Sequence, residues 1–423
     1  MRPLTDNPVV APEDDSFHFG PYVDVLHAAV EQATPLPLTV GVFGSWGAGK
    51  SSFLRLWEGR FKAGRTRTIW FNPWKYDRKV EVWAALLHTI LAEMEQEETL
   101  KDKAVKLAKA ATWLSVRAGL GTAAALGTGG VIKSGDVDAL LKGLSEGDAE
   151  QYRQVNRFEA DFADAVREFV GEDGRLVVFV DDLDRCSPES AMTVLESLKL
   201  FLAQSQCVFV LALDVDVLAA IATNKFGAAL KGAPADVASG MAYLEKIVQL
   251  PFFLPDVGFD TLREAYRPYV LELSDDPVFW ELLQRGLGGN PRRLKRYINV
   301  FNMALAVSRG QLPPGAIDRR YRLQLAMLLI IRTLHRGFFH ALTAEPDSWQ
   351  TLTRFFEQAQ TQPSIRQTAT LQLPQHLHDF ATNLVLERLL TYSGGERLDP
   401  PGGPVVVQMI STLRSTAGPV DPE

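Results

Sequence analysis

Two hydrophobic patterns divide the chain into a mixed part and a helical part. Up to about residue 255, short and almost wholly apolar runs alternate with helical segments, and these runs are 38–43, 68–71, 176–180 and 206–213. Apolar runs of this length are typical of parallel strands that are buried on both faces. Beyond residue 256 only helical periodicity is visible, with apolar residues three and four positions apart. We therefore predict an α/β fold, with a three-layer α/β/α arrangement around a parallel sheet and a C-terminal helical domain.

Breaks in these patterns suggest the boundaries of four regions. A polar, proline-containing arm precedes the first helical pattern, and an irregular insert at about 96–150 interrupts the α/β part. The arm is expected over 1–20, the α/β core over 21–255, a first helical region over 256–310, and a last helical region of unknown role over 311–423.

Within the insert, residues 107–132 are apolar and rich in alanine and glycine. A membrane span needs about 20 predominantly apolar residues, and this stretch reaches that length only with Arg117 near its middle, which is costly in a bilayer. Its glycines also weaken it as a helix in water. We therefore favour a helix followed by a flexible glycine loop, and keep membrane or partner contact by 107–132 as the disfavoured alternative.

Composition and charge favour some partners and compartments over others. The 423 residues are 46% hydrophobic and 22% charged, which is ordinary for a soluble globular protein. A net charge of −7 does not favour a nucleic-acid partner. Cys186 and Cys207 lie in or beside apolar runs, as reduced cytosolic thiols do, and the polar N-terminus does not resemble a signal peptide. We expect a cytoplasmic location, with membrane association as the alternative.

The first predicted strand runs directly into Gly-Ser-Trp-Gly-Ala-Gly-Lys-Ser at 44–51, and a helical pattern follows. Strand, glycine-rich loop and helix with the spacing G-x-x-x-x-G-K-[ST] predict a phosphate-binding loop. Its glycines allow close backbone approach, and its N–H groups and helix N-terminus attract anions. Lys50 is expected to reach the β- and γ-phosphates of a nucleotide, and Ser51 to ligate Mg²⁺. The expected binding residues are Gly44, Ser45, Trp46, Gly47, Ala48, Gly49, Lys50, Ser51 and Ser52.

A pair of acids, Asp181 and Asp182, follows the strand predicted at 176–180. At the tip of a buried strand beside a phosphate loop, one carboxylate is placed to hold Mg²⁺ and the next to act on the attacking water. We assign Asp181 to the metal and Asp182 to catalysis. For Arg185 we favour an ion pair with Asp182 or Asp184 over contact with a phosphate of a neighbouring protomer.

Two other positions near predicted strand tips have two interpretations each. Asp214 follows the strand at 206–213 and either senses the γ-phosphate or caps the next helix. Trp74 follows the strand at 68–71, and we favour a core position for it over stacking on a base.

A further candidate lies in the helical region, where Asn290 and Pro291 predict the start of a helix. This start places Arg292 and Arg293 at the positive end of the helix dipole, where arginine is unfavourable. Such a mismatch occurs at functional sites. Solvated or ion-paired arginines are the equal alternative.

Several of these stretches, taken in order, resemble the KAP family of P-loop NTPases. They read GVFGSWGAGKSSFL, WFNPWKY, VVFVDDLDRC, FVLALDVDVL, YLEKIVQLPF and GNPRRLKRYINVF, and they span about residues 20–305. The resemblance implies an ATPase core related to the STAND and AAA+ groups. It also implies that ATP and Mg²⁺ bind at Lys50, Ser51 and Asp181, with a catalytic role for Asp182.

The same resemblance bears on the helical region and the insert. GNPR is similar to the sensor-2 motif of related ATPases, which makes 256–310 a lid and Arg292 a γ-phosphate contact, with Arg293 as the alternative. Many family members carry transmembrane helices between the two nucleotide motifs. In this chain the stretch 107–132 takes that place.

Three hypotheses of function follow. We favour a nucleotide-dependent switch with slow or regulated ATP hydrolysis, whose ATP form assembles into a homo-oligomer or engages a partner protein. Family context suggests bacterial defence against phage or signalling at a membrane. The alternatives are an ATP-driven motor acting on nucleic acid or protein, which the acidic charge disfavours for DNA, and an adaptor that binds nucleotide without significant turnover.

Overall fold

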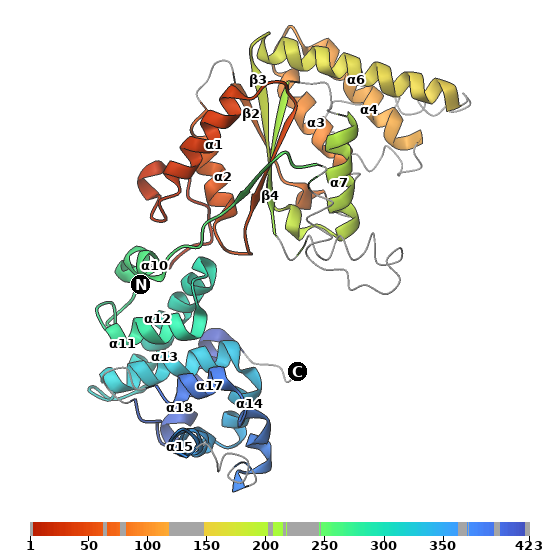
Figure 1. The fold of residues 1–423 in the computed structure, drawn as a ribbon. Coiled ribbons are helices and arrows are strands. Elements are labelled where there is room, and N and C mark those ends of the chain that lie inside the picture. Colours follow the sequence, from red (N-terminus) through yellow and green to blue (C-terminus); the bar gives the residue numbers. More distant parts are fainter. Residues whose placement is uncertain are drawn as a thin grey trace. The chain divides into compact units, whose positions relative to one another are not determined.

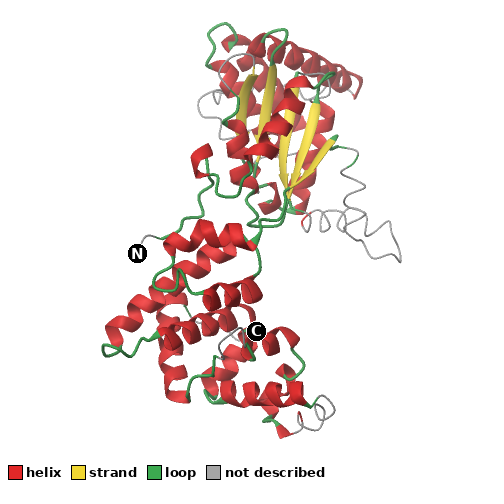
Figure 2. Ribbon diagram, turned by 60° about the vertical axis from the view of Figure 1, so that its left-hand side comes forward, coloured by secondary structure: helices red, strands yellow, loops and turns green. Residues whose placement is uncertain are grey.

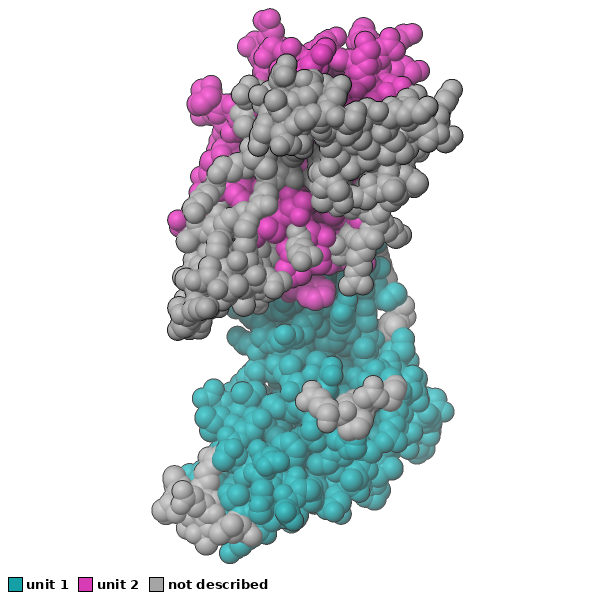
Figure 3. All heavy atoms as spheres, turned by 90° about the vertical axis from the view of Figure 1, so that its right-hand side faces the viewer, with its two compact units in different colours: residues 1–7, 256–423 teal, residues 8–255 magenta. Residues whose placement is uncertain are grey.

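The computed structural model describes residues 3–61, 66–76, 82–117, 148–201, 206–214, 217, 245, 247–362, 370, 372–392 and 398–418. The chain forms two compact units, which Figure 3 colours separately. The sheet unit comprises residues 8–255, and the helical unit comprises residues 1–7 and 256–423.

Five parallel strands form the sheet of the sheet unit, in the order β2-β3-β4-β1-β5. Four of them match the predicted apolar runs, and the α/β prediction is confirmed. The fifth strand pairs with β1 as the outermost strand of the sheet, and it was not predicted. The strands are β1 (Leu38–Phe43), β2 (Thr66–Phe71), β3 (Arg175–Val180), β4 (Cys207–Leu213) and β5 (Leu250–Phe253).

Helices cover both faces of this sheet, as the three-layer prediction requires (Figures 1 and 2). Strand β3 shows the reason, because its side chains are buried in both directions. Val178 and Val180 belong to the core formed with α3, α4, α6 and α7, whereas the Phe179 ring lies 6.0 Å from the Trp57 ring of α2. The helices are α1 (Gly20–Gln32), α2 (Lys50–Glu58), α3 (Val82–Glu95), α4 (Lys101–Arg117), α6 (Asp148–Val170) and α7 (Pro188–Phe201).

The strand register brings several polar residues together at the carboxyl ends of the strands. The N–H of Gly44, just after β1, donates to the Leu213 carbonyl at the end of β4, 3.1 Å away. The N–H of Asp181, just after β3, donates to the Phe71 carbonyl at the end of β2, 3.0 Å away. The carboxyl ends of β1, β2, β3 and β4 therefore meet at this edge, where ligands bind in open parallel sheets.

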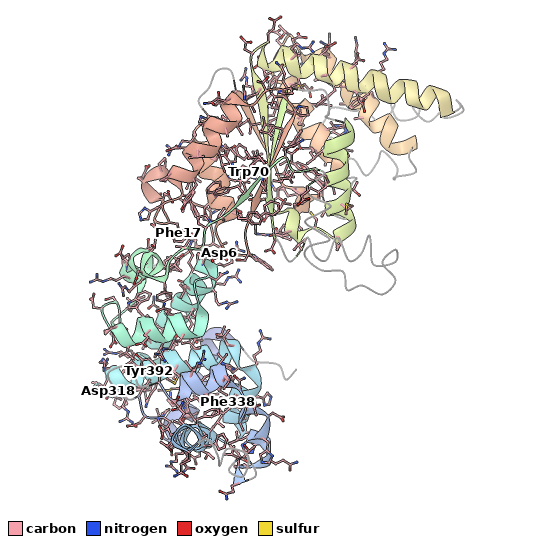
Figure 4. All side chains as sticks on the ribbon, in the orientation of Figure 1. Asp6, Phe17, Trp70, Asp318, Phe338 and Tyr392 are labelled. Carbon is pink, nitrogen blue, oxygen red and sulfur yellow. The ribbon has the colours of Figure 1, made fainter. Side chains whose placement is uncertain are left out.

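The helical unit is built from capped amphipathic helices. Asp276, Asn290, Asp318 and Asn383 each accept a hydrogen bond from a backbone N–H in the first turn of a helix, and Asp318 is labelled in Figure 4. Such caps satisfy donors that the helix leaves unpaired. The helices are α10 (Phe259–Tyr266), α11 (Pro277–Leu287), α12 (Pro291–Gln311), α13 (Arg319–Leu334), α14 (Arg336–Ala344), α15 (Ser348–Thr361), α17 (Leu384–Leu390) and α18 (Gly403–Ala417).

Short 3-10 turns complete the described elements, namely η1 (Pro12–Asp14), η2 (Pro73–Lys75), η4 (Leu183–Arg185), η5 (Arg267–Tyr269) and η7 (Gln375–Phe380). In the helical unit, α12 continues to Gln311 and packs against both α13 and α18. The described helices of 256–310 and 311–423 therefore share one unit, and their separate roles stay predictions.

The insert is described only in part. Helix α4 includes the start of the apolar stretch at 107–132, but residues 118–132, with the predicted glycine loop, lie outside the described residues. Within the described ranges, no single helix is both long and apolar enough to cross a membrane. Only α13 and α14 pass on length and composition as a pair, with a bend of 119° between them.

Candidate functional site

The loop at 44–51 joins β1 to α2, so the predicted order of strand, loop and helix is confirmed. Gly47 and Gly49 have φ angles of +86° and +108°, which glycine adopts without the strain that a Cβ atom brings. Gly49 is restricted further, because a Cβ atom there would lie 3.1 Å from the Phe19 ring. The helix begins directly afterwards at Lys50, so the first N–H groups of α2 face the loop.

Lys50 is the charged centre of this edge, and its side chain is only 8% exposed. Its ammonium group donates to the carbonyls of Gly44 at 2.9 Å and Ser45 at 3.3 Å. Two carboxylates also face it, since its Nζ lies 3.3 Å from Asp184 Oδ2 and 3.7 Å from Asp214 Oδ2. A lysine held among loop carbonyls and acids is placed to exchange these partners for phosphate oxygens.

Ser51 and Asp181, the two residues predicted to hold Mg²⁺, are brought together. The Asp181 carboxylate is 7% exposed and accepts hydrogen bonds from Ser51 and from the N–H of Asp182. Burial raises the pKa of the Asp181 carboxyl group, and the charge of Asp182 raises it further. A divalent cation beside Asp181 would favour the ionised form of its carboxyl group.

The donor set suits Mg²⁺ in particular. Among the residues that the structure describes, no group of three or more His, Cys, Asp or Glu could hold a metal ion. Mg²⁺ is usually held by one or two carboxylates together with phosphates and water. A hydroxyl and a carboxylate beside a phosphate loop fit that mode of binding.

Asp182 has both carboxylate oxygens engaged. Its Oδ2 accepts a hydrogen bond of 2.7 Å from the Asn72 side chain, and its Oδ1 lies 2.7 Å from Arg185 Nε. Its backbone has a left-handed φ of +59°, which is uncommon for a residue other than glycine and is worth noting at functional sites. The structure therefore fixes the direction of the carboxylate that we assigned to catalysis, with Asn72 as its hydrogen-bond donor and Arg185 as its ion-pair partner.

The contacts of Arg185 and Trp74 decide between the alternatives given for each of them. Arg185 forms the favoured ion pair, and its partner is Asp182. Its guanidinium group also lies 5.2 Å from the centre of the Trp74 ring. Trp74 is 51% exposed, so its assignment to the core was wrong. The reason is that η2 turns the chain outward immediately after β2.

Asp214 lies at the end of β4 and is 5% exposed. Its contact with Lys50 places it at the phosphate loop, as the sensor hypothesis requires. The alternative, a cap on the next helix, concerns residues from 215 onward, and 215 and 216 lie outside the described residues.

The N-terminal segment contributes contacts that were not predicted. The N–H of Val9 donates to the Ser52 hydroxyl at 3.0 Å, directly after the lysine and serine of the phosphate loop. Phe17 and Phe19, whose rings lie 5.8 Å apart, both approach the position where Gly49 would carry a Cβ atom. The only sequence signal was the aromatic pair in a polar arm. Such a pair does not reveal its distant partner.

The predicted helix start at Asn290 and Pro291 is confirmed in the helical unit, since Asn290 Oδ1 accepts from the N–H of Arg293 at 3.0 Å. Arg292 Nε lies 3.8 Å from Asp6 Oδ2, and the Arg293 side chain donates to the Leu287 carbonyl at 3.4 Å. Arg292 therefore forms the ion pair that the alternative interpretation expected, and its partner is Asp6. Contact of either arginine with a γ-phosphate stays a prediction.

Among solved structures, the chain has a distant likeness to the ORC2 protein of Aeropyrum pernix in its ADPNP-ADP complexes. The TM-score is 0.35 with 13% sequence identity, over 98% of this chain and 98% of that chain. A likeness at this level carries no argument about function. No curated protein matches the sequence.

The family comparison is informative. The KAP family P-loop domain matches residues 19–307, which is more than half of the chain. The match includes the loop at 44–51, the acids after β3 and the arginines at the start of α12. The chain belongs to the KAP family of P-loop NTPases.

Proposed function

We propose that this protein binds ATP with Mg²⁺, hydrolyses it slowly, and acts as a nucleotide-dependent switch. The observation that carries the proposal is the position of Lys50, a buried lysine that begins α2 and directs its ammonium group at loop carbonyls and acids. A phosphate-loop lysine in this position is suited to the β- and γ-phosphates.

The neighbouring residues supply the other parts of such a site. Ser51 and Asp181 would hold Mg²⁺, which when bound neutralises phosphate charge. Asp182 would orient the attacking water and accept its proton. Asp214 would contact the γ-phosphate, with Arg292 or Arg293 as a second contact from the helical unit.

Slow, regulated turnover is supported by the partners of Asp182. Its carboxylate accepts a hydrogen bond from Asn72 and pairs with Arg185, so both of its oxygens are already engaged before a water molecule can approach. A change that loosens either contact would make one of these oxygens available to the attacking water. Turnover would then depend on the conformation of the turn after β3.

We further propose a cytoplasmic location and an ATP form that assembles with itself or engages a partner protein. The net charge of −7 disfavours nucleic acid as that partner. A role in bacterial defence against phage or in signalling at a membrane rests on analogy with the family.

The test is ATP binding and hydrolysis by the full-length protein over a range of protein concentrations. Lys50→Ala is expected to weaken nucleotide binding, with Lys101→Ala at the exposed start of α4 as its control. Asp182→Asn is expected to keep ATP binding and lose turnover by about 100-fold or more, with the exposed Asp173→Asn as its control. Sizing runs with ATP and Mg²⁺ and with ADP measure assembly.

The outcomes separate the three hypotheses. A larger ATP form with activity that rises with concentration supports the switch. Strong stimulation of turnover by DNA would instead indicate a motor. Stabilisation by ATP without turnover would indicate an adaptor. Unchanged ATP affinity in Lys50→Ala would refute the phosphate-loop assignment itself.

A further inference from the structure

Lys50 has more acceptors around it than protons to donate, and one of these acceptors has no role in the proposed site. An ammonium group carries three donors. Its neighbours are the carbonyls of Gly44 and Ser45 and the carboxylates of Asp184 and Asp214. Asp214 already has a proposed role, whereas Asp184 has none. Of the two acids, Asp184 is the closer to Nζ, at 3.3 Å compared with 3.7 Å.

The turn after β3 directs its two acids to different partners. The buried Leu183 anchors η4, Asp182 bonds to Asn72 and Arg185, and Asp184 faces Lys50. Asp184 is 13% exposed at its side chain, so its charge is poorly screened by water. Asp214, in contrast, directly follows the central strand β4. Asp184 lies on a single short turn and is the acid better placed to move aside.

We propose that Asp184 occupies the place of a terminal phosphate at Lys50 and thereby sets the preference of the site between nucleoside triphosphate and diphosphate. This inference rests on the proposed function of the phosphate loop. A diphosphate brings one phosphate group to Lys50, in exchange for the loop carbonyls, and leaves the Asp184 pair in place. A triphosphate brings a second anionic group and must displace Asp184, whose charge then repels it.

The contribution of this repulsion follows from the short distance and low exposure of the pair. A like charge at contact distance in a partly buried site is worth more than a factor of ten in affinity. Removing the charge of Asp184 should therefore favour the triphosphate selectively. The diphosphate should gain little, because it never competes with Asp184 for Lys50.

The test measures dissociation constants of ADP and of the non-hydrolysable triphosphate ADPNP, each with Mg²⁺, for the full-length protein. Asp184→Asn is expected to bind ADPNP about tenfold more tightly and ADP less than about threefold more tightly. Asp184→Glu keeps the charge and should keep the wild-type ratio. Asp173 is exposed just before the start of β3, so Asp173→Asn serves as the control for the change in net charge. Asp184→Ser provides a second neutral variant, and circular dichroism confirms that each variant folds.

Three outcomes would overturn the inference. Weaker ADPNP binding by both neutral variants would mean that Asp184 supports the metal or the nucleotide. An equal gain for ADP and ADPNP would mean that Asp184 repels any anion and does not discriminate. Unchanged dissociation constants for both nucleotides would mean that Lys50 does not exchange Asp184 for phosphate. Failure of the wild type to bind either nucleotide is a different result, because it refutes the proposed function as well.

Discussion

Replacing Gly49 by alanine tests whether the shape of the phosphate loop is fixed by packing as well as by backbone angle. Gly49 has a φ of +108°, and a Cβ atom there would lie 3.1 and 3.3 Å from two atoms of the Phe19 ring. Left-handed backbone costs other residues roughly 1–2 kcal/mol, and overpacking typically costs about 1–3 kcal/mol. Alanine offsets about 0.4–1 kcal/mol of this by restricting the unfolded chain. We expect Gly49→Ala to lower the free energy of unfolding of the sheet unit by roughly 1–5 kcal/mol.

Gly171→Ala is the matched control in the same unit. Gly171 has a φ of +84°, and nothing lies within 4 Å of the position of its missing Cβ atom. Its substitution should therefore show the backbone cost alone, roughly 0–1.5 kcal/mol after the unfolded-state offset. The difference between the two variants isolates the contact with Phe19. Urea denaturation followed by tryptophan fluorescence measures both, because Trp57 is fully buried in the sheet unit, and the two units are fitted as separate transitions.

The same variant should also affect nucleotide binding. Helix α2 begins at Lys50, directly after Gly49, so a backbone shift at Gly49 moves the residue that carries the positive charge. We expect Gly49→Ala to bind nucleotide at least about tenfold more weakly than Gly171→Ala. If the free energies of unfolding of the two variants differ by less than about 0.5 kcal/mol, Phe19 does not restrict position 49. If Gly49→Ala loses stability but binds nucleotide with unchanged affinity, the backbone at position 49 does not control the position of Lys50.

Two further predictions concern the metal site and the helical unit. Asp181→Asn should stabilise the ligand-free protein by on the order of 1 kcal/mol and remove Mg²⁺-dependent nucleotide binding. Because burial raises the pKa of Asp181, the folded wild type holds this proton more strongly than the unfolded chain. The wild type should therefore lose stability relative to Asp181→Asn as pH rises through that pKa, which melting temperatures between about pH 4 and pH 8 would measure. Arg292→Ala should lower ATP turnover about 100-fold while ADP affinity changes less. Arg296→Ala, which loses the same partner Asp6, is the control, and equal losses in both would indicate packing alone.

The sequence predicted the features of this fold that are encoded locally. The strands β1, β3 and β4 are unbroken apolar runs with turns at their ends, and the phosphate loop is defined by spacing. Strand β5 was missed because its residues include Pro251 and a partly exposed face, so it lacks the pattern of a central strand. Its partner is β1, far away along the chain. Proline is tolerated there because β5 lies at the edge of the sheet.

The contacts between distant segments could not be predicted in the same way. Asn72 and Asp182 are 110 positions apart, and Val9 and Ser52 are 43 apart. The first pair forms because β2 and β3 are neighbours in the sheet, and the second because the N-terminal segment lies against the start of α2. A single sequence shows that Asn72 follows a strand, but it does not show that this strand lies beside β3.

The arrangement of the acids after β3 depends on one backbone angle. Asp182 adopts φ +59°, a conformation that costs a residue other than glycine free energy and persists only where its surroundings hold it. The bonds to Asn72 and Arg185 provide that hold. Because Asp184 follows two residues later in the same short turn, the angle at Asp182 also determines whether Asp184 reaches Lys50. The contacts of Asp182 and the charge on Lys50 are therefore coupled through the backbone. A change that frees Asp182 to act on water should also weaken the hold of Asp184 on Lys50.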